Sequence, residues 1–254
     1  MGPTTKSSFV AGSSREGQRV AAARRSAPTS ASMLMPYLAV ALLSSFTAQE
    51  LLNRSIAYHD PQGSWGRGAF KIAELASRPD GTISRNLLLI DNARSRFELE
   101  SSLDGHALTL VVENDVALAR LDGRTSLSAD ELERYRLKPA QILSRRNRDL
   151  YLWGLPMKLR DRGARLDARV EETQFAGRAV YKLRVTYDAD VGGDRWYFFL
   201  DHETCALIGH RFYHDEAAGD GEYAVLSEEI SGQGLRLPDD EPVITHTIQS
   251  IVAP

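Results

Sequence analysis

The stretch Arg178–Asp201, RAVYKLRVTYDADVGGDRWYFFLD, decides the fold class of this chain. Apolar or aromatic side chains occupy every second position from Ala179 to Tyr187, and Lys, Arg and Thr alternate with them. A period of two is typical of a β-strand with one apolar and one polar face. A Gly192-Gly193 turn then leads into the second apolar run, RWYFFLD. The stretch therefore predicts an antiparallel hairpin in a sheet that buries only one of its faces.

Similar runs lie on both sides of this hairpin. Turn signals occur at Pro79-Asp80-Gly81, Asp104-Gly105 and Asn114-Asp115, and the last two are about ten residues apart, which is the spacing of a meander. The runs are AFKIAELASRPDGTISRNLLLIDN (69–92), SRFELESSLDGHALTLVVENDVALARLDG (95–123), TCALIGHRFYH (204–214), EYAVLSEEI (222–230) and PVITHTIQSIV (242–252).

Helical signals occur at three places. AQELLNRSIAYHD (48–60) groups Leu51, Leu52, Ile56 and Tyr58 on one side of a helix. Ser128 and Glu131 form a capping-box pattern, which predicts a helix from Ala129, and Pro139 suits the first turn of another. In that last helix we expect four residues on the buried side: Ile142, Leu143, Leu150 and Leu152. The sequence thus predicts an α+β domain, a curved antiparallel sheet or incomplete β-barrel of about nine to eleven strands with two or three helices.

The N-terminal segment has a different composition. Residues 1–32 are rich in Ser, Ala, Gly, Thr and Arg, and Met33–Leu43 is an apolar run too short for the ~20 residues of a membrane-spanning helix. Small residues follow it, as in a secretory signal peptide. The alternative is a buried core helix. We predict a leader at 1–48, with Met33 or Met35 as alternative starts, and one domain at 49–254.

Composition narrows the class of protein. The net charge of −3 provides no basic footprint for nucleic acid, and the basic cluster LSRRNRD (143–149) is interpreted as a solvated helix face. The one cysteine, Cys205, excludes an intramolecular disulfide, and it is interpreted as a small apolar strand residue. No cysteine follows the apolar run to carry a lipid anchor. The processed chain is therefore expected to be exported, soluble and without a stable membrane span.

The acidic stretch RFYHDEAAGDGEY (211–223) raises the question of a metal site. On a strand, His210 and His214 would lie about 13 Å apart, which one zinc ion cannot bridge. Calcium-loop spacing is interrupted by Ala217-Ala218-Gly219. We therefore predict no metal, and a hairpin in which Asp215 and Asp220 accept hydrogen bonds from turn amides.

No phosphate-binding loop, GxSxG elbow, HExxH or CxxC motif occurs, so the sequence predicts no cofactor and assigns no catalytic residue. The repeated Tyr-His-Asp triplet leaves one enzymatic alternative open. In it, an envelope hydrolase uses His59, His214 and Asp215, which requires the two triplets to meet in space.

Large apolar side chains offer a different kind of site. A sheet with one apolar face buries it against helices, another sheet or a ligand. By size and alternation, six residues are candidates for the lining of an apolar ligand cavity: Trp153, Leu155, Met157, Tyr181, Trp196 and Phe198. The alternative is that they fill an ordinary core.

Four segments, YHDP (58–61), YLWGLPMKLRD (151–161), LRVTYDADVGGDRWYFFLD (183–201) and RFYHDEAAGDGEY (211–223), resemble a family of exported bacterial proteins of unknown function. That family is similar in fold to the outer-membrane lipoprotein carriers LolA and LolB. The resemblance implies an incomplete antiparallel barrel around helices, with an apolar cavity for acyl chains. It further implies a periplasmic binding or carrier protein whose partner is a lipid or an acylated protein. A non-catalytic envelope scaffold is the other alternative.

Overall fold

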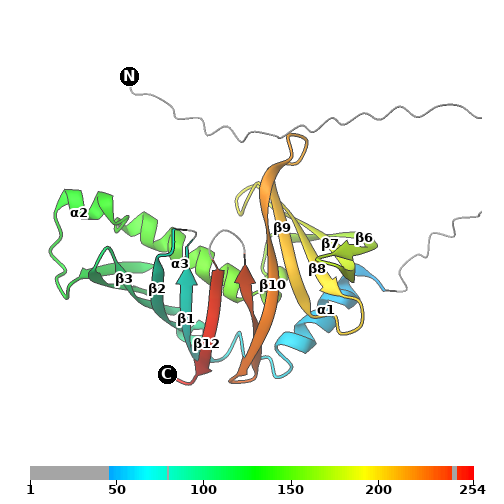
Figure 1. Ribbon diagram of the computed structural model, residues 1–254, viewed down its shortest axis with the longest axis horizontal. Coiled ribbons are helices and arrows are strands. Elements are labelled where there is room, and N and C mark those ends of the chain that lie inside the picture. Colours follow the sequence, from blue (N-terminus) through cyan, green and yellow to red (C-terminus); the bar gives the residue numbers. More distant parts are fainter. Residues whose placement is uncertain (1–45, 79, 242–244) are drawn as a thin grey trace, which may run out of the picture. The chain divides into compact units, whose positions relative to one another are not determined.

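The computed structural model describes residues 46–78, 80–241 and 245–254 (Figure 1). The predicted leader lies outside these residues as far as residue 45, and the domain boundary at 48–49 stays a prediction. In the described part, one antiparallel sheet of twelve strands packs against three α-helices. The helices are α1 (Ala48–His59), α2 (Ala129–Arg134) and α3 (Pro139–Trp153), with short 3-10 turns η1 (Asn92–Arg94) and η2 (Met157–Arg160).

The strands form two meanders that meet in the middle of the sheet. The first contains β1 (Ala69–Ser77), β2 (Ile83–Asp91), β3 (Arg96–Leu103), β4 (His106–Glu113) and β5 (Val116–Leu121). The second contains β6 (Ala164–Phe175), β7 (Arg178–Tyr187), β8 (Arg195–Asp201), β9 (Leu207–Asp215), β10 (Asp220–Gly232), β11 (Leu235–Glu241) and β12 (Thr245–Val252).

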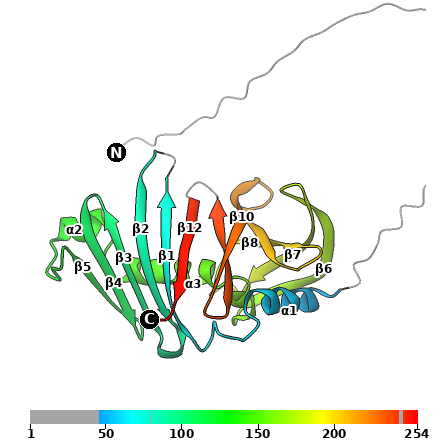
Figure 2. The ribbon, with the colours of Figure 1, turned by 60° about the horizontal axis from the view of Figure 1, so that its bottom comes forward.

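The strand order is β5-β4-β3-β2-β1-β12-β11-β10-β9-β8-β7-β6, so that β5 and β6 are the two edges (Figure 2). Antiparallel pairing of β1 with β12, from Lys71↔Val252 to Ser77↔Thr245, joins the meanders. The segment between the edge strands carries α2 and α3. The predicted class, an α+β chain with a curved, open antiparallel sheet, is confirmed.

The strand count exceeds the predicted range because β6 and β11 were not recognised in the sequence. Strand β6 is an edge strand whose sequence, ARLDARVEETQF, carries five charges among twelve residues, as exposed edges do. Strand β11 contains Pro238, which argues against a central strand because proline has no backbone N–H. Pro238 pairs with Glu229 at an irregularity of β10, between Leu226 and Glu229, where a ladder hydrogen bond is not required.

The concave face of the sheet carries the hydrophobic core. Strand β1 alternates buried and half-buried residues along its length, as predicted for a one-sided sheet. Helix α1 packs against β6 and β11, and α3 packs against β4 and β5. One cluster joins both meanders, and its fully buried members include Leu51, Phe70, Ile90, Phe97, Leu99, Ile142 and Phe198.

The helices begin where the sequence predicts. Reciprocal bonds of a capping box start α2 at Ala129, and Pro139 is the first residue of α3. Of the expected buried residues of α3, Ile142 is buried, and Leu143, Leu150 and Leu152 are partly buried against the core. Tyr58 is an exception: it is half-buried, and its hydroxyl donates to Glu229 instead of entering the main core.

Two expectations for the start of β9 are corrected. Cys205 is buried, but it lies in the β8–β9 turn and not in a strand. Strict period-two alternation along TCALIGHRFYH (204–214) would place Ile208 on the same face as His210. Instead, Ile208 is the extra residue of a bulge in β9 opposite Phe199 and Leu200, and it packs with Val180 and Phe199 in a separate small cluster.

His59 connects α1 to two strands. Its side chain is fully buried; Nε2 accepts a hydrogen bond of 2.9 Å from the Leu207 amide, and Nδ1 lies 2.7 Å from the Arg236 carbonyl. Because Nε2 accepts, Nδ1 carries the proton and donates it to that carbonyl. Burial lowers the pKa of His59, which keeps the imidazole neutral.

We predict that His59→Leu lowers the free energy of unfolding by about 2–4 kcal/mol, because it leaves a buried amide and a buried carbonyl without partners. Urea denaturation measures this loss. Tyr58→Phe is the matched control on the same helix, since it removes a single hydrogen bond in an exposed pair and should cost at most about 1 kcal/mol. Equal losses in the two variants would refute the role given to His59.

Candidate functional site

A cavity of about 500 Å³ lies between α3 and the concave face of the sheet. It falls within the range of small-molecule sites in proteins. Both meanders contribute to its lining, as do the end of α3 and the turn that follows it. We call it the α3 cavity, and its lining contains Glu74, Ala76, Arg78, Ser84, Asn86, Ser101, Ser102, Leu103, Leu108, Arg145, Arg148, Asp149, Leu152, Trp153, Leu155, Leu207, His210, Glu222, Leu226, Leu237, Pro238 and His246.

Part of the lining is apolar. Leucines come from β3 and β4, from the end of α3 and the following turn, and from β9, β10 and β11. Trp153 adds the largest apolar surface, and its ring meets that of His246 edge to face at a centroid distance of 6.2 Å. This part of the cavity suits an apolar group, because burial of such surface is the main source of affinity there.

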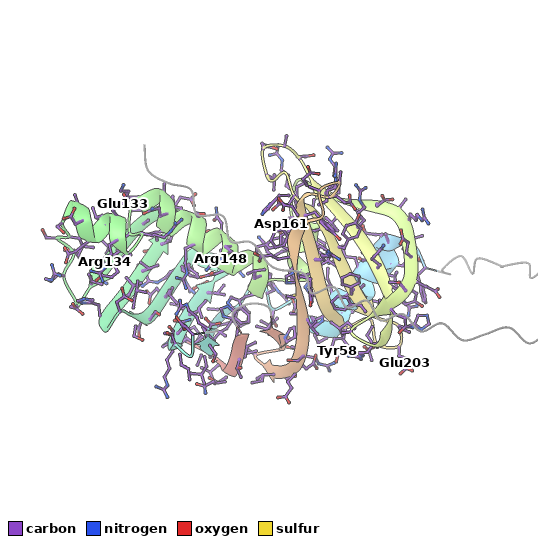
Figure 3. The ribbon with its side chains drawn as sticks, turned by 45° about the horizontal axis from the view of Figure 1, so that its top comes forward. Tyr58, Glu133, Arg134, Arg148, Asp161 and Glu203 are labelled. Carbon is purple, nitrogen blue, oxygen red and sulfur yellow. The ribbon has the colours of Figure 1, made fainter. Side chains whose placement is uncertain are left out.

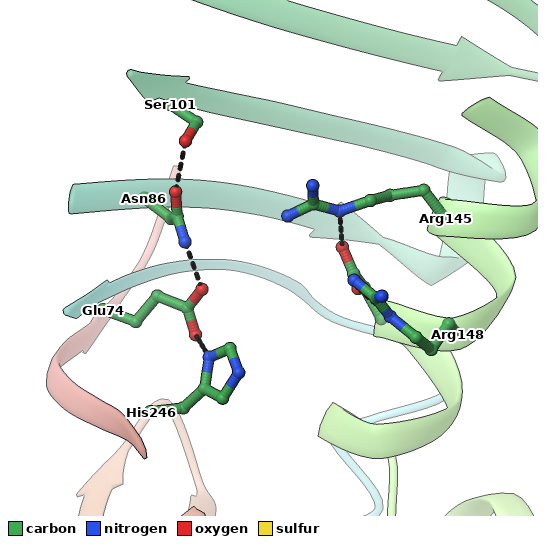
Figure 4. Close-up of polar contacts among 7 residues, drawn as sticks. Glu74, Asn86, Ser101, Arg145, Arg148 and His246 are labelled. Carbon is green, nitrogen blue, oxygen red and sulfur yellow. Dashed lines mark hydrogen bonds and ion pairs between the residues drawn. The ribbon is translucent and has the colours of Figure 1, made fainter. Parts of the chain in front are cut away.

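A polar row crosses the concave face beside it (Figure 4). Asn86 Nδ2 donates to Glu74 Oε1 at 2.7 Å, and Ser101 Oγ donates to Asn86 Oδ1. His246 Nδ1 lies 3.2 Å from Glu74 Oε2. These residues belong to neighbouring strands β12, β1, β2 and β3, so that the register of the sheet builds the row. Both oxygens of the buried Glu74 carboxylate therefore have hydrogen-bond donors.

Two arginines form the opposite wall. Arg148, labelled on α3 in Figure 3, donates to Asp149 Oδ1 through Nη2 at 3.0 Å. Arg145 donates to Asp149 Oδ2 through Nε at 3.2 Å, and its terminal nitrogens point across the gap toward Asn86 and Ser101 (Figure 4). Asp149 itself is 6% exposed. One buried carboxylate thus orients two guanidinium groups at the cavity wall.

His210 is the unusual polar residue of the cavity. It is 6% exposed, and no described residue forms a hydrogen bond with its Nδ1. Its ring lies between aromatic neighbours, with centroids 5.5 Å from Trp196 and 6.4 Å from Phe198. Burial lowers the pKa of His210 to about 4, so that the side chain is neutral at pH 7.

The structure separates the six residues that the sequence proposes for a ligand cavity. Trp153 and Leu155 line the α3 cavity. Met157, Tyr181 and Phe198 are buried in the main core, and Trp196 packs half-buried against it. Ligand binding by these residues stays a prediction.

The basic cluster at 143–149 was interpreted as a solvated face, and the side chain of Arg148 is indeed 61% exposed. Sequence reasoning missed that Arg145 and Arg148 also line the α3 cavity. A signal was present. Arg145, Arg148 and Asp149 stand at positions i, i+3 and i+4, which share one side of a helix. Arg146 lies elsewhere on the helix and pairs with Asp115.

The hydrolase arrangement is not formed. His59 contacts the first residue of β9, Leu207, whereas His214 stands near the far end of the same strand, about 23 Å further along. His214 is exposed and bonds Asp194. Asp215 accepts from the amides of Ala217 and Ala218, as predicted, whereas within the described residues no turn amide donates to Asp220. The two Tyr-His-Asp triplets therefore do not build one reaction centre.

The strand geometry of His210 and His214 confirms that they cannot share a metal ion. Within the described ranges, no group of three or more His, Cys, Asp or Glu side chains is placed to hold one. Among the helices described, none has the length and apolar character to cross a membrane.

A family model described as a family of unknown function (DUF6503) matches residues 34–229. A LolA superfamily protein from Nitrosomonas europaea is similar in structure, with a TM-score of 0.49 and 12% identity over 83% of this chain and 94% of that one. A DUF1329 family protein from Desulfovibrio piger has a TM-score of 0.40 and 10% identity over 81% and 92%. MucB in the MucA/MucB complex of Pseudomonas aeruginosa has a TM-score of 0.25 and 18% identity over 80% and 57%. No curated protein matches the chain significantly.

We predict that His210 makes the fold sensitive to acid. The unfolded chain takes up a proton on this residue below about pH 6.5, whereas the folded chain does so only near pH 4. The contribution of His210 is therefore present above about pH 6.5 and is lost as the pH falls toward 4, by about 3 kcal/mol in total. Urea denaturation at pH 7 and pH 4 measures it. His210→Phe should lose about 3 kcal/mol less than the parent over this interval, and equal losses in the two proteins would disprove the assignment.

Proposed function

The chain belongs to the DUF6503 family of unknown function, and we propose that it is a soluble binding or carrier protein for a lipid, acyl chain or lipoprotein of the cell envelope. The α3 cavity carries this proposal. It is a pocket of about 500 Å³ whose leucines and Trp153 come from several elements and converge on one space.

Physical chemistry supports an apolar ligand. Each Å² of apolar surface removed from water contributes about 25 cal/mol, so an acyl chain in contact with these leucines gains affinity without any charged group. The ordering of the ligand offsets part of that gain. A carrier needs such moderate affinity, because it must also release its cargo.

The proposal extends to the compartment. The predicted leader at 1–48 favours export. We propose a periplasmic domain at 49–254 whose partner is a lipid or an acylated protein, and not nucleic acid.

The first test is native mass spectrometry of the processed protein, purified from its own envelope, followed by organic extraction. A co-purifying acyl lipid is the expected result, and it would identify the ligand class. A ligand-free mass that also stays unchanged after incubation with lipid extract would contradict the proposal and favour a scaffold.

We predict that Ala76→Leu abolishes most of this lipid retention, at least tenfold by mass spectrometry, because it fills part of the α3 cavity from β1. The matched control is Ala73→Leu, which places the same side chain on the same strand but on the opposite face of the sheet. Circular dichroism and thermal unfolding verify that both variants are folded. Equal retention by the two variants would exclude this cavity as the binding site.

A further inference from the structure

We infer that the ligand is an anionic amphiphile, whose negative head lies against Arg145 and Arg148 and whose ester or amide group bonds His210, while its chain contacts the leucines. This inference rests on the proposed function and names the ligand chemistry that the same cavity selects. Three features of the lining support it. Arg145 and Arg148 have guanidinium donors that no described residue uses, the carboxylate of Glu74 already has hydrogen-bond donors, and the buried His210 has a nitrogen that no described residue bonds.

The arginine wall has more donors than the protein uses. Two guanidinium groups carry ten N–H donors, and they share the single carboxylate of Asp149. That contact occupies Nε of Arg145 and both Nε and Nη2 of Arg148. Terminal nitrogens of Arg145 have no acceptor within the described part of the chain, and two cations against one carboxylate leave one positive charge. A phosphate or carboxylate head matches both the charge and the planar donor geometry.

The opposite wall, formed by the polar row that contains Glu74, does not require a positively charged ligand group. Glu74 is buried, but Asn86 and His246 already bond its two oxygens. The negative charge of Glu74 is thus stabilised by the protein, and a ligand gains little by bringing a positive group to it. Over the whole lining, the charges of Arg78, Arg145 and Arg148 balance those of Glu74, Asp149 and Glu222, so the positive surplus is local to α3.

His210 gives the second polar contact. A buried nitrogen without a hydrogen-bond partner costs stability. Neighbouring protein atoms cover Nδ1, so a ligand bonds it when the ring turns about its Cβ–Cγ bond toward the cavity. The lining of the cavity includes His210 together with Leu207 and Leu226. A neutral imidazole suits an uncharged partner, such as an ester or amide carbonyl. That group joins head and chain in an acyl lipid, which agrees with a position between the arginines and the leucines.

Simpler ligands fit fewer of these features. A neutral acyl lipid would satisfy His210 and the leucines, but it would leave the spare donors of Arg145 and Arg148, whose side chains are 37% and 61% exposed, to water. An inorganic anion would satisfy the arginines and leave the apolar lining and His210 unused. Only a molecule with all three parts uses the whole cavity.

The test compares three probes by isothermal titration calorimetry on the full processed protein. Oleoyl lysophosphatidate and monoolein share the same chain, ester and glycerol, and differ by the phosphate; inorganic phosphate is the third probe. We expect lysophosphatidate to bind at least tenfold more tightly than monoolein, and inorganic phosphate alone to show no saturable binding. Lysophosphatidate should also protect the folded protein against heat.

Single variants locate the head. Arg145→Gln and Arg148→Gln each leave Asp149 one arginine partner, and each should weaken lysophosphatidate about tenfold while leaving monoolein unchanged. Arg134→Gln, an exposed arginine on α2 outside the cavity, controls for the loss of one charge. His210→Phe should weaken both lipids by a similar factor, since both contain the ester.

The outcomes separate the two levels of the proposal. Equal affinities for the two lipids, with no effect of the arginine variants, would overturn the anionic head and leave acyl binding in place. Saturable binding of inorganic phosphate with the same arginine dependence would overturn the amphiphile and indicate a small-anion site. No binding of either lipid would overturn the proposed function together with this inference.

Discussion

The pairing of β1 with β12 is the constraint on which the remaining structure depends. It brings together residues that are far apart in the chain, such as Glu74 and His246, which are 172 residues apart. Closing a loop of that length costs conformational entropy, which local hydrogen bonds alone would not offset. The common core beneath both meanders offsets it, because the pairing places one apolar face of twelve strands around α1 and α3. Without this pairing, the two meanders would no longer share that core.

The cavity follows from how that face is covered. Helix α1 packs against β6 and β11, and α3 packs against β4 and β5, so neither helix is centred on the strands at the junction of the meanders. There the concave side of β1 and β2 changes from apolar to polar, with Glu74, Ser84 and Asn86 where an ordinary core would have leucines. Buried polar groups of this kind are tolerated because they bond one another. The result is a space with a polar and an apolar part.

Two buried histidines show how the same residue type takes different roles. Both are neutral, because burial disfavours the charged form and lowers the pKa of each. Both nitrogens of His59 bond backbone atoms, so that it ties α1 to β9 and β11. Among the described residues, the Nδ1 of His210 has no hydrogen-bond partner although the ring is almost fully buried. Folding thus explains both nitrogens of His59, whereas the contacts of His210 are those of its ring with Trp196 and Phe198.

The amino-acid sequence by itself determined the class of fold and most of its elements. Period-two alternation, glycine and aspartate turns, and the Ser128–Glu131 capping box are local properties, and local properties can be recognised without a partner strand. The family followed from four ordered motifs. Strands β6 and β11 were missed because an edge strand is charged and Pro238 is a poor strand residue. Their positions in the sheet explain both.

The site depended on tertiary structure still more than the fold did. Long-range strand pairing, and how far each helix covers the sheet, decide which aromatic residues face a cavity. They also decide whether a basic helix face meets solvent or a wall of polar side chains. Trp153 and Leu155 were among the sequence candidates for the cavity lining. Arg145, Arg148 and His210 were not, because only the tertiary structure brings them to the same cavity.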